Sequence, residues 1–272
     1  MRWLLSILNF SFLTLSCFCA AAQKPVGVAY YDVDRIYDTI PALFYDDSDY
    51  TPEGRLGWTS ERYTRKIRNT AAVIDSMGLE IVALWGVENE QVVRDLSAAC
   101  KGDYSYLHRT LNSLNGMDFA LLYYGDLFYP TYDESGRGYL YVEGELGRDT
   151  VGLVLCSDPR TARWLIGDLR EERPHAKLLV LGRTGSFFTT DFGLRDRTLR
   201  AEKAGRGNVR SARKWQMRDR IWADTALKTS EGEVFARRYL VDQKTGNPLT
   251  TYSRGVYRGG YGYSLPVFVY IR

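Results

Sequence analysis

The chain has 272 residues, 45% of them hydrophobic, and a formal net charge of +3. This length suffices for one sizeable core or at most two domains, and the total charge is unremarkable. Because only two histidines (His108 and His175) and no Cys-x-x-Cys pair are present, a His-rich or zinc site is not expected.

The first residues have the pattern of a secretory signal peptide. Arg2 supplies the positive start, residues 4–15 the apolar stretch, and Ala20–Ala22 a small-residue cleavage site. We therefore expect a mature chain of residues 23–272, periplasmic or extracellular, with no transmembrane segment. A lipid anchor on Cys17 is the alternative, although Thr14 is a poor first residue for the lipobox that such an anchor needs.

The mature chain contains no linker-like, repetitive or low-complexity tract, so we expect a single domain. Cys100 and Cys156 remain after cleavage, in a compartment that permits disulfides. Each lies at the apolar end of a predicted element. We therefore expect two buried free thiols rather than a bond between them.

An apolar run over residues 26–31 predicts the first strand, which leads into an acidic, proline-containing loop. Thr59 or Ser60 can cap a helix whose apolar residues recur every three or four positions up to Gly78. The run over residues 81–85 has the length of a buried strand. It ends at Gly86, in a turn before a helical pattern.

Further elements follow from the same patterns. They are helices at 90–99 and from Thr161 to about Glu172, and strands at 117–124, 139–146, 150–156, 177–181, 218–223 and 265–271. Some of these strands form hairpins and others precede helices. This mixture indicates an α/β protein with mixed sheets rather than a purely parallel one.

The charge is uneven along the chain. Residues 31–53 carry seven acidic side chains against Arg35 alone, whereas residues 195–220 carry ten Lys and Arg against three acids. We interpret the basic segment as a solvated, mobile loop. The alternative is a polyanion-binding surface formed by Arg195, Arg197, Arg200, Lys203, Arg206, Arg210, Arg213 and Lys214.

Seven stretches of the chain follow, in order, the motifs of one family. They are residues 29–38, 50–54, 58–63, 84–89, 115–123, 215–219 and 259–266. In these stretches the chain resembles the endonuclease/exonuclease/phosphatase (DNase I-like) family, in the exported form common among Bacteroidetes-type bacteria. The resemblance implies a four-layer α/β/β/α sandwich, in which two mixed sheets pack face to face with helices outside.

The resemblance also implies phosphoester cleavage with Mg²⁺, an ion that needs hard oxygen ligands. The family's first-strand asparagine falls at Asp32, which is a weak candidate for a metal ligand. Its metal-binding glutamate falls at Gly86, which has no side chain. Its Asn-His pair after the hairpin falls at Cys156 and Ser157.

The remaining family positions are also replaced. The Asp and Asn of the Gly-Asp-Phe-Asn motif fall at Arg183 and Gly185. The closing Asp-His pair falls at Tyr263 and Ser264, and the substrate-side arginine falls at Asn115. A cation at Arg183 opposes binding of a metal ion beside it.

Four polar family residues are retained, and we expect structural roles for them. Glu88 and Asn89 are predicted to cap the helix that follows, and Asp118 to fix a strand end by hydrogen bonds. Asp219 is predicted to do similar work in the strand near Trp215.

These replacements predict a catalytically inactive member of the family, kept as a binding module and without a cofactor. Its former cleft is expected to be lined by Arg183, Ser157, Tyr263 and Ser264, and to bind an anionic or sugar-like ligand. Removing one electrostatic stabiliser slows an enzyme a hundred- to thousandfold, but here the whole catalytic unit has changed.

Two alternatives stay open. The first is an active Mg²⁺-dependent phosphodiesterase or nuclease with a rearranged site built on Asp32, Asp34 and Glu88. The second is a polyanion-binding module that acts through the basic segment.

Overall fold

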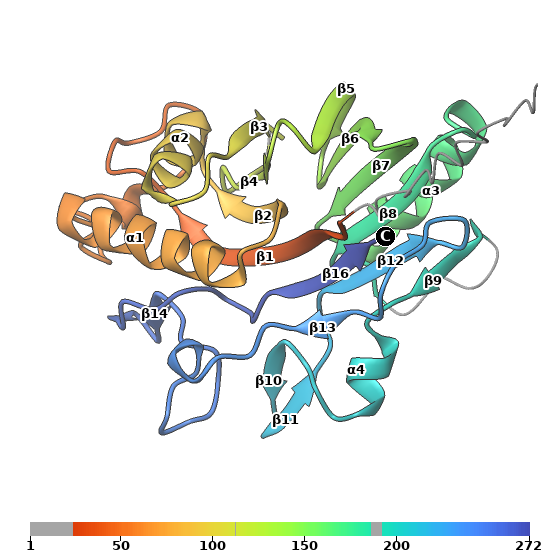
Figure 1. Ribbon diagram of the computed structural model, residues 1–272. Helices are drawn as coiled ribbons and strands as arrows, with labels where there is room; N and C mark the ends of the chain where they lie inside the picture. Colours follow the sequence, from red (N-terminus) through yellow and green to blue (C-terminus); the bar gives the residue numbers. More distant parts are fainter. Residues whose placement is uncertain (1–23, 112, 186–191) are drawn as a thin grey trace, which may run out of the picture.

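Two six-stranded mixed sheets form the centre of the molecule in the computed structural model, which describes residues 24–111, 113–185 and 192–272 (Figure 1). The first sheet has the order β13-β16-β1-β2-β4-β3 and the second the order β5-β6-β7-β8-β12-β9. The pairs β1–β2 and β7–β8 are parallel, and all other neighbours in the two sheets are antiparallel.

The strands of the first sheet are β1 (Val26–Ile36), β2 (Ile81–Val87), β3 (Ser105–Arg109), β4 (Asp118–Tyr123), β13 (Glu233–Val234) and β16 (Val267–Ile271). Those of the second are β5 (Phe128–Gly136), β6 (Tyr139–Leu146), β7 (Asp149–Cys156), β8 (Lys177–Gly182), β9 (Leu194–Asp196) and β12 (Arg220–Asp224). Two short hairpins, β10 (Val209–Ser211) with β11 (Lys214–Gln216) and β14 (Tyr252–Ser253) with β15 (Val256–Tyr257), lie outside them.

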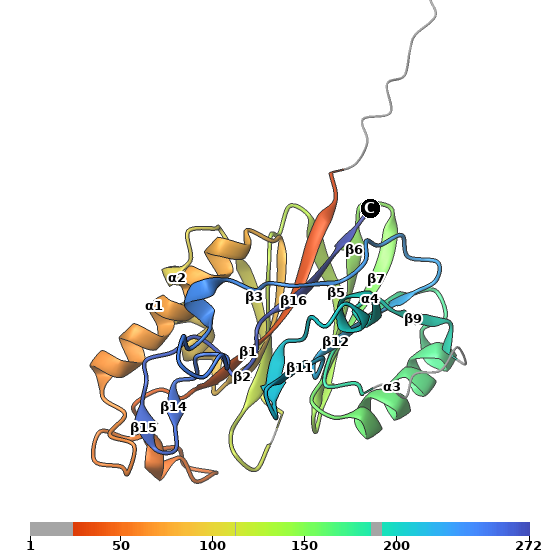
Figure 2. The same ribbon diagram turned by 90° about the horizontal axis from the view of Figure 1, so that it is seen from below.

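Helices cover the outer faces of both sheets. α1 (Ser60–Met77) and α2 (Glu90–Ala99) lie on the first sheet and α3 (Pro159–Glu172) on the second, so that four layers are visible in Figure 2. The predicted α/β/β/α sandwich is therefore confirmed. The described residues also form a short helix, α4 (Leu199–Lys203), and the 3₁₀ turns Ser48–Tyr50 and Arg238–Leu240.

Alternation along the strands builds the core. In β1, Val28 and Tyr30 point to the layer between the two sheets, whereas Ala29 and Tyr31 point to α1 and α2. This period of two lets one strand serve two apolar layers, and it explains why the run reads as continuously hydrophobic. A third apolar cluster joins α3 to the second sheet.

The helix starts follow their capping residues. Thr59 and Asn89 accept hydrogen bonds from the backbone N–H groups of Arg62 and Val92, which confirms the predicted starts of α1 and α2. Asp158 caps α3 and accepts from Arg160 and Thr161. That helix therefore begins at Pro159, two residues before the predicted start.

The prediction for the basic segment is wrong. Residues 195–220 are not a solvated loop but contribute to β9, α4, β10, β11 and β12. Arg197 and Arg206 pair with Glu231 and Glu233, and Arg220 pairs with two acids inside the fold. Their charge density misled the prediction because the carboxylates that neutralise them are distant in sequence or lie on elements too short to show a pattern.

Cys100 and Cys156 are both free, as predicted; Cys156 is fully buried and Cys100 only partly so. Within the described residues, none of the helices is both long and apolar enough to pass through a bilayer. The predicted signal peptide, residues 1–22 with Cys17, lies outside the described residues.

Chain direction brings several element ends together. The carboxyl ends of β1 and β2 meet because these strands are parallel, and β16 begins beside them because it runs antiparallel. In the facing sheet, β8 ends and β12 begins at the same edge. Side chains near Asp32, Gly86, Gly182, Asp219 and Ser264 therefore converge.

Candidate functional site

A cavity of about 230 Å³ opens where these strand ends meet. Its lining residues come from both sheets and the loops between them: Asp32, Asp34, Arg35, Trp85, Gly86, Asn115, Met117, Arg183 and Tyr263. This is the position at which the family resemblance puts the catalytic centre.

The Arg218 guanidinium occupies the floor of this region, between two carboxylates. Its Nη2 lies 2.7 Å from Asp32 Oδ2 and 2.8 Å from Asp219 Oδ2, and its Nε donates to Asp219 Oδ1 at 2.9 Å. The Arg218–Asp219 contact is thus bidentate, the strongest geometry for such a pair. Both carboxylates are almost completely buried.

A second layer of hydrogen bonds holds Asp219 in place. Asn208 Nδ2 and Ser264 Oγ both donate to Asp219 Oδ2, at 2.6 and 2.7 Å. Asn208 Oδ1 in turn accepts from the backbone N–H of Arg218. The Tyr263 ring lies 4.4 Å from the guanidinium carbon and shields its outer side.

One guanidinium cannot neutralise two carboxylates completely. Burial raises the pKa of Asp32 to about 6, although the Arg218 guanidinium opposes this rise; the charge of Asp219 adds to it. The pKa of Arg218 rises despite burial, because Asp219 and Asp32 stabilise its charge. Arg218 is therefore a permanent cation at this position.

Arg183 supplies a second cation, whose contact with Asp32 is longer than that of Arg218. Its Nη2 is 3.9 Å from Asp32 Oδ2 and its side chain is 42% exposed. Among the described residues, neither Arg183 Nε nor Arg218 Nη1 has a hydrogen-bond acceptor. Both of these N–H groups are buried, whereas the half-exposed Arg183 guanidinium lines the cavity and favours an acceptor-rich, anionic ligand there.

Gly86 lies at a β-bulge, where the pairing of β2 with β4 shifts register. Its φ is 97°, and a Cβ atom there would be only 3.1 Å from the backbone nitrogen of Arg35. The neighbouring segment of β1 is also bulged, with Asp34 and Arg35 at positive φ. The backbone itself therefore requires glycine at this position.

The other replaced family positions divide into two groups. Arg183 and Tyr263 line the cavity as predicted, and Asn115 lines it as well, whereas Ser264, also predicted to line it, is buried against Asp219. Gly185 is not among the lining residues, and its φ is 67°.

The prediction that Ser157 lines the cleft is wrong. Its hydroxyl donates to the carbonyl of Gly138 at 3.2 Å, which ties it to the β5–β6 turn instead. The Cys156 side chain packs in the apolar cluster under α3, and only its carbonyl reaches toward the site, where it accepts from the Arg183 N–H.

Three of the retained polar residues line a different cavity. Glu88, Asn89 and Asp118 border a space of about 390 Å³ that shares no residue with the first cavity. Asn89 caps α2 as predicted, and Asp118 fixes its strand end by accepting from the Leu111 N–H and contacting His108 Nε2.

Two of the predicted roles need correction. Glu88 caps no helix; its carboxylate accepts from the Asp38 N–H and the Tyr45 hydroxyl, and so holds the acidic loop. Asp219 does more than fix a strand end, because it is the main partner of Arg218. The contacts of Glu88 join residues far apart in sequence, which is why no local pattern predicted them.

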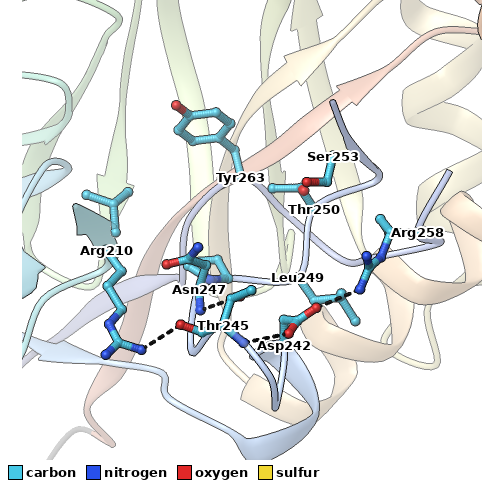
Figure 3. Close-up of a pocket in the computed structure, with 11 residues that line it drawn as sticks. Arg210, Asp242, Thr245, Asn247, Leu249, Thr250, Ser253, Arg258 and Tyr263 are labelled. Atoms are coloured by element: carbon cyan, nitrogen blue, oxygen red, sulfur yellow. Dashed lines mark hydrogen bonds and ion pairs between the residues drawn. The ribbon is translucent and has the colours of Figure 1, made fainter. Parts of the chain in front are cut away.

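A second polar pocket of about 270 Å³ adjoins the Arg218 site and shares Tyr263 with it (Figure 3). Arg210 and Arg258 stand on opposite sides of this pocket in the figure, where Arg210 donates to the Thr245 carbonyl and Arg258 pairs with Asp242. Tyr263 is the one residue that lines both spaces.

The model of the Endonuclease/Exonuclease/phosphatase family matches residues 27–156, from the first strand to the end of β7. Over these residues the chain is similar to this family. No curated protein is significantly similar to it in sequence.

Solved structures of the endonuclease/exonuclease/phosphatase type share the fold at low sequence identity. A family protein from Bacteroides thetaiotaomicron is 14% identical, with a TM-score of 0.59 over 91% of this chain and 95% of that one. A family protein from Bacteroides vulgatus is 12% identical, with a TM-score of 0.59 over 92% and 99%. A mannosyl-6-phosphatase from Bacteroides thetaiotaomicron is 13% identical, with a TM-score of 0.58 over 91% and 99%.

The Mg²⁺ that the family implies does not fit the residues of this site. Gly86 offers no ligand atom, and Asp32 is committed to the Arg218 guanidinium. The described part of the chain contains no group of three or more His, Cys, Asp or Glu that could hold a metal ion. Glu88, which the rearranged-site alternative needs, lines the other cavity.

Sequence reasoning missed Arg218 and Asn208, which organise the site. Arg218 was counted with the basic segment, although it directly precedes the retained Asp219. That adjacency was the available signal, because a cation beside a retained buried carboxylate is a candidate for its partner.

Replacing Arg218 by alanine would leave Asp32 and Asp219 buried without a cation. We expect Arg218→Ala to lower the free energy of unfolding by roughly 3–5 kcal/mol in urea denaturation. Arg183→Ala is the matched control: its guanidinium is half-exposed and distant, so its removal should cost less than about 1 kcal/mol. Equal losses in both variants would contradict the role given to Arg218.

Restoring the family's carboxylate should fail. We expect Gly86→Glu and Gly86→Ala to destabilise the fold alike, by roughly 1–3 kcal/mol, because the cost comes from the backbone and Cβ rather than the carboxylate. Thermal melting of both variants with and without about 10 mM MgCl₂ checks this, because a bound ion would raise the melting temperature. A stabilisation by Mg²⁺ seen only in Gly86→Glu would show that the position still belongs to a metal site.

Glu88 should make stability fall as pH rises. Burial raises its pKa from 4.5 to about 7, so between these values the folded chain holds a proton that the unfolded chain has lost. The unfolding free energy should therefore decrease from pH 4.5 to 7, by at most about 3 kcal/mol, and then level off. In Glu88→Gln this component should vanish, whereas Glu145→Gln, at an exposed site, should keep it; unchanged pH profiles in both would refute the assignment.

Proposed function

We propose that this chain is an exported endonuclease/exonuclease/phosphatase domain that does not hydrolyse phosphoesters and instead binds an anionic ligand in the former catalytic cleft. The observation that carries the proposal is the Arg218 guanidinium, held between Asp32 and Asp219 at 2.7 and 2.8 Å. A fixed organic cation stands where a metal-dependent family member needs carboxylates free to bind Mg²⁺. Export rests on the signal-like pattern of residues 1–22 alone.

Other groups that phosphoester hydrolysis in this family requires are also replaced. Hydrolysis needs a group that positions or activates water and another that stabilises the phosphoryl oxygens. Arg183, Tyr263 and Ser264 stand at the corresponding positions, and none of them is a base at neutral pH. The cleft can hold an anion, and Asp32, one of its two carboxylates, is already bound by the Arg218 guanidinium.

The ligand class follows from the donors. Arg183 lines the cavity with a half-exposed guanidinium that lies 3.9 Å from Asp32 Oδ2, and the adjoining pocket adds Arg210 and Arg258. Cations at both ends and an aromatic ring between them fit a small molecule with a phosphate and a polar body. A structural neighbour is a mannosyl-6-phosphatase, so sugar phosphates are the first class to test.

Isothermal titration calorimetry with mannose 6-phosphate, mannose and inorganic phosphate tests binding. We expect the sugar phosphate to bind without added metal and unphosphorylated mannose not to bind. Arg183→Ala should weaken the affinity by about tenfold or more, since hydrogen bonds to charged groups contribute roughly 1.5–3 kcal/mol. Arg195→Ala, an exposed cation that lines neither cavity, is the control and should bind as the unmodified chain does.

Hydrolysis is tested in parallel with bis(p-nitrophenyl) phosphate in Mg²⁺ or Mn²⁺. We expect no turnover above that of an Asp32→Ala variant. Turnover that disappears in this variant, or Mg²⁺ bound by Asp32 with millimolar affinity or better, would establish the active-enzyme alternative and overturn the proposal. Binding of heparin that is lost on neutralising Arg206, Arg210 and Arg213 would instead support the polyanion module.

A further inference from the structure

The cavity beside Glu88 is bordered by an exposed apolar surface. We call Ile40, Leu43, Phe44 and Leu114 the apolar rim; their side chains are 70%, 89%, 94% and 86% exposed. Phe44 and Leu114 line the mouth of the cavity, and Ile40 and Leu43 belong to the same loop as Phe44. Large apolar side chains with such exposure, gathered around one opening, are typical of an interaction site.

The apolar rim is a defined surface and not two unrelated loop tips. The Tyr45 ring packs directly on Gly116, so closely that a Cβ atom there would be 2.2 Å from it. Tyr45 is also tied to Glu88 by its hydroxyl, at 2.9 Å. The loop of residues 38–47 and the loop that contains Leu114 therefore meet at a fixed point on the cavity wall.

The cavity floor is acidic and lacks a full countercharge. Glu88 is 3% exposed and forms hydrogen bonds only with uncharged groups, the Asp38 N–H and the Tyr45 hydroxyl. Asp118, the other carboxylate in the wall, has His108 behind it. Within the described part of the chain no Lys or Arg pairs with Glu88 or lines this cavity, in contrast to Asp32 and its Arg218.

The surroundings reinforce this charge. Between residues 36 and 54 the sequence contains five acidic side chains and no Lys or Arg. Asp38 accepts from Asn89 at the cavity wall, and Asp47 accepts from the Ala42 N–H within the rim loop. The field at the cavity mouth is therefore negative, and it attracts cations and disfavours anions.

We propose that this cavity and the apolar rim form a docking site for a partner polypeptide, whose lysine or arginine enters toward Glu88 while flanking apolar side chains cover Phe44 and Leu114. The cavity volume of about 390 Å³ exceeds what one long basic side chain needs. Such a residue carries an apolar stem and a charged tip, which matches an apolar mouth over an acidic floor. The site does not depend on the ligand of the Arg218 cleft, because the two cavities share no residue.

Selection from a random heptapeptide library displayed on phage, against the full mature chain at pH 8, tests the proposal. We expect the selected peptides to share a Lys or Arg next to an aromatic or aliphatic residue. Synthetic versions should lose at least about tenfold in affinity on Glu88→Gln, because a buried charge pair loses its partner. Phe44→Ser should weaken them as well, whereas Tyr129→Ser, an exposed aromatic side chain on β5, should not.

Three results would overturn the proposal. They are a selection with no enrichment over the Glu88→Gln variant, selected peptides without a basic residue, and peptide affinity that is unchanged in both Glu88→Gln and Phe44→Ser. Sedimentation velocity and flotation with phosphatidylcholine vesicles address other occupants. A dimer that dissociates on Phe44→Ser would assign the rim to a second copy, and vesicle binding that survives Glu88→Gln would assign it to a lipid surface.

Thermal melting of each variant shows whether the fold is intact. If Glu88→Gln unfolds, replacing the lysine of the selected peptide by norleucine provides the same test from the other side. This change keeps the stem and removes the charge, so affinity should fall at least about tenfold. An equal affinity for the norleucine peptide would refute the proposal.

Discussion

The Arg218 guanidinium is shared by Asp32 and Asp219, and the arrangement of the site depends on this contact. Asp32 belongs to the first sheet and Arg218 and Asp219 precede a strand of the second, so the ion pair joins the two sheets at the edge where the cleft opens. Asn208 and Ser264 satisfy the remaining lone pairs of Asp219. Partners of this kind offset much of the free-energy cost of burying the charges.

The same contact explains why the fold and the proposed loss of hydrolysis are compatible. Carboxylates that gather around a metal ion repel one another when the ion is absent, and a structure that no longer binds the ion needs another cation. Arg218 provides one that is covalently part of the chain. Gly86 fits this arrangement. It has no side chain to bind a metal ion, and the backbone conformation at the bulge disfavours any residue that has a Cβ atom.

Glu88 is the counterpart that has no such cation. Both Asp32 and Glu88 are buried carboxylates near the ends of adjacent strands, and burial raises the pKa of each. Arg218 opposes this rise at Asp32, whereas at Glu88 only hydrogen bonds from Asp38 and Tyr45 do so. In the proposed docking site, the partner supplies the cation that Glu88 lacks among the described residues.

Much of the fold was predictable from the sequence, because the central strands and the three long helices carry strong local patterns. The runs at 26–31, 81–85 and 177–181 and the caps at Thr59 and Asn89 act within a few residues, and they were located correctly. The motif order also indicated the family and its layers. Strands such as β9, β10 and β13 were missed because they are two or three residues long and exist only through their pairing partners.

For the site too, some features follow from local sequence patterns and others only from tertiary contacts. From the sequence alone, the resemblance predicts which family positions differ in this chain, among them Gly86, Arg183 and Tyr263, since each difference lies within one motif. Only the tertiary structure decided that Arg218 pairs with Asp32, 186 residues away, and that Glu88 faces a separate cavity. These contacts cross between sheets and loops, and no local pattern records which buried charge will meet which partner.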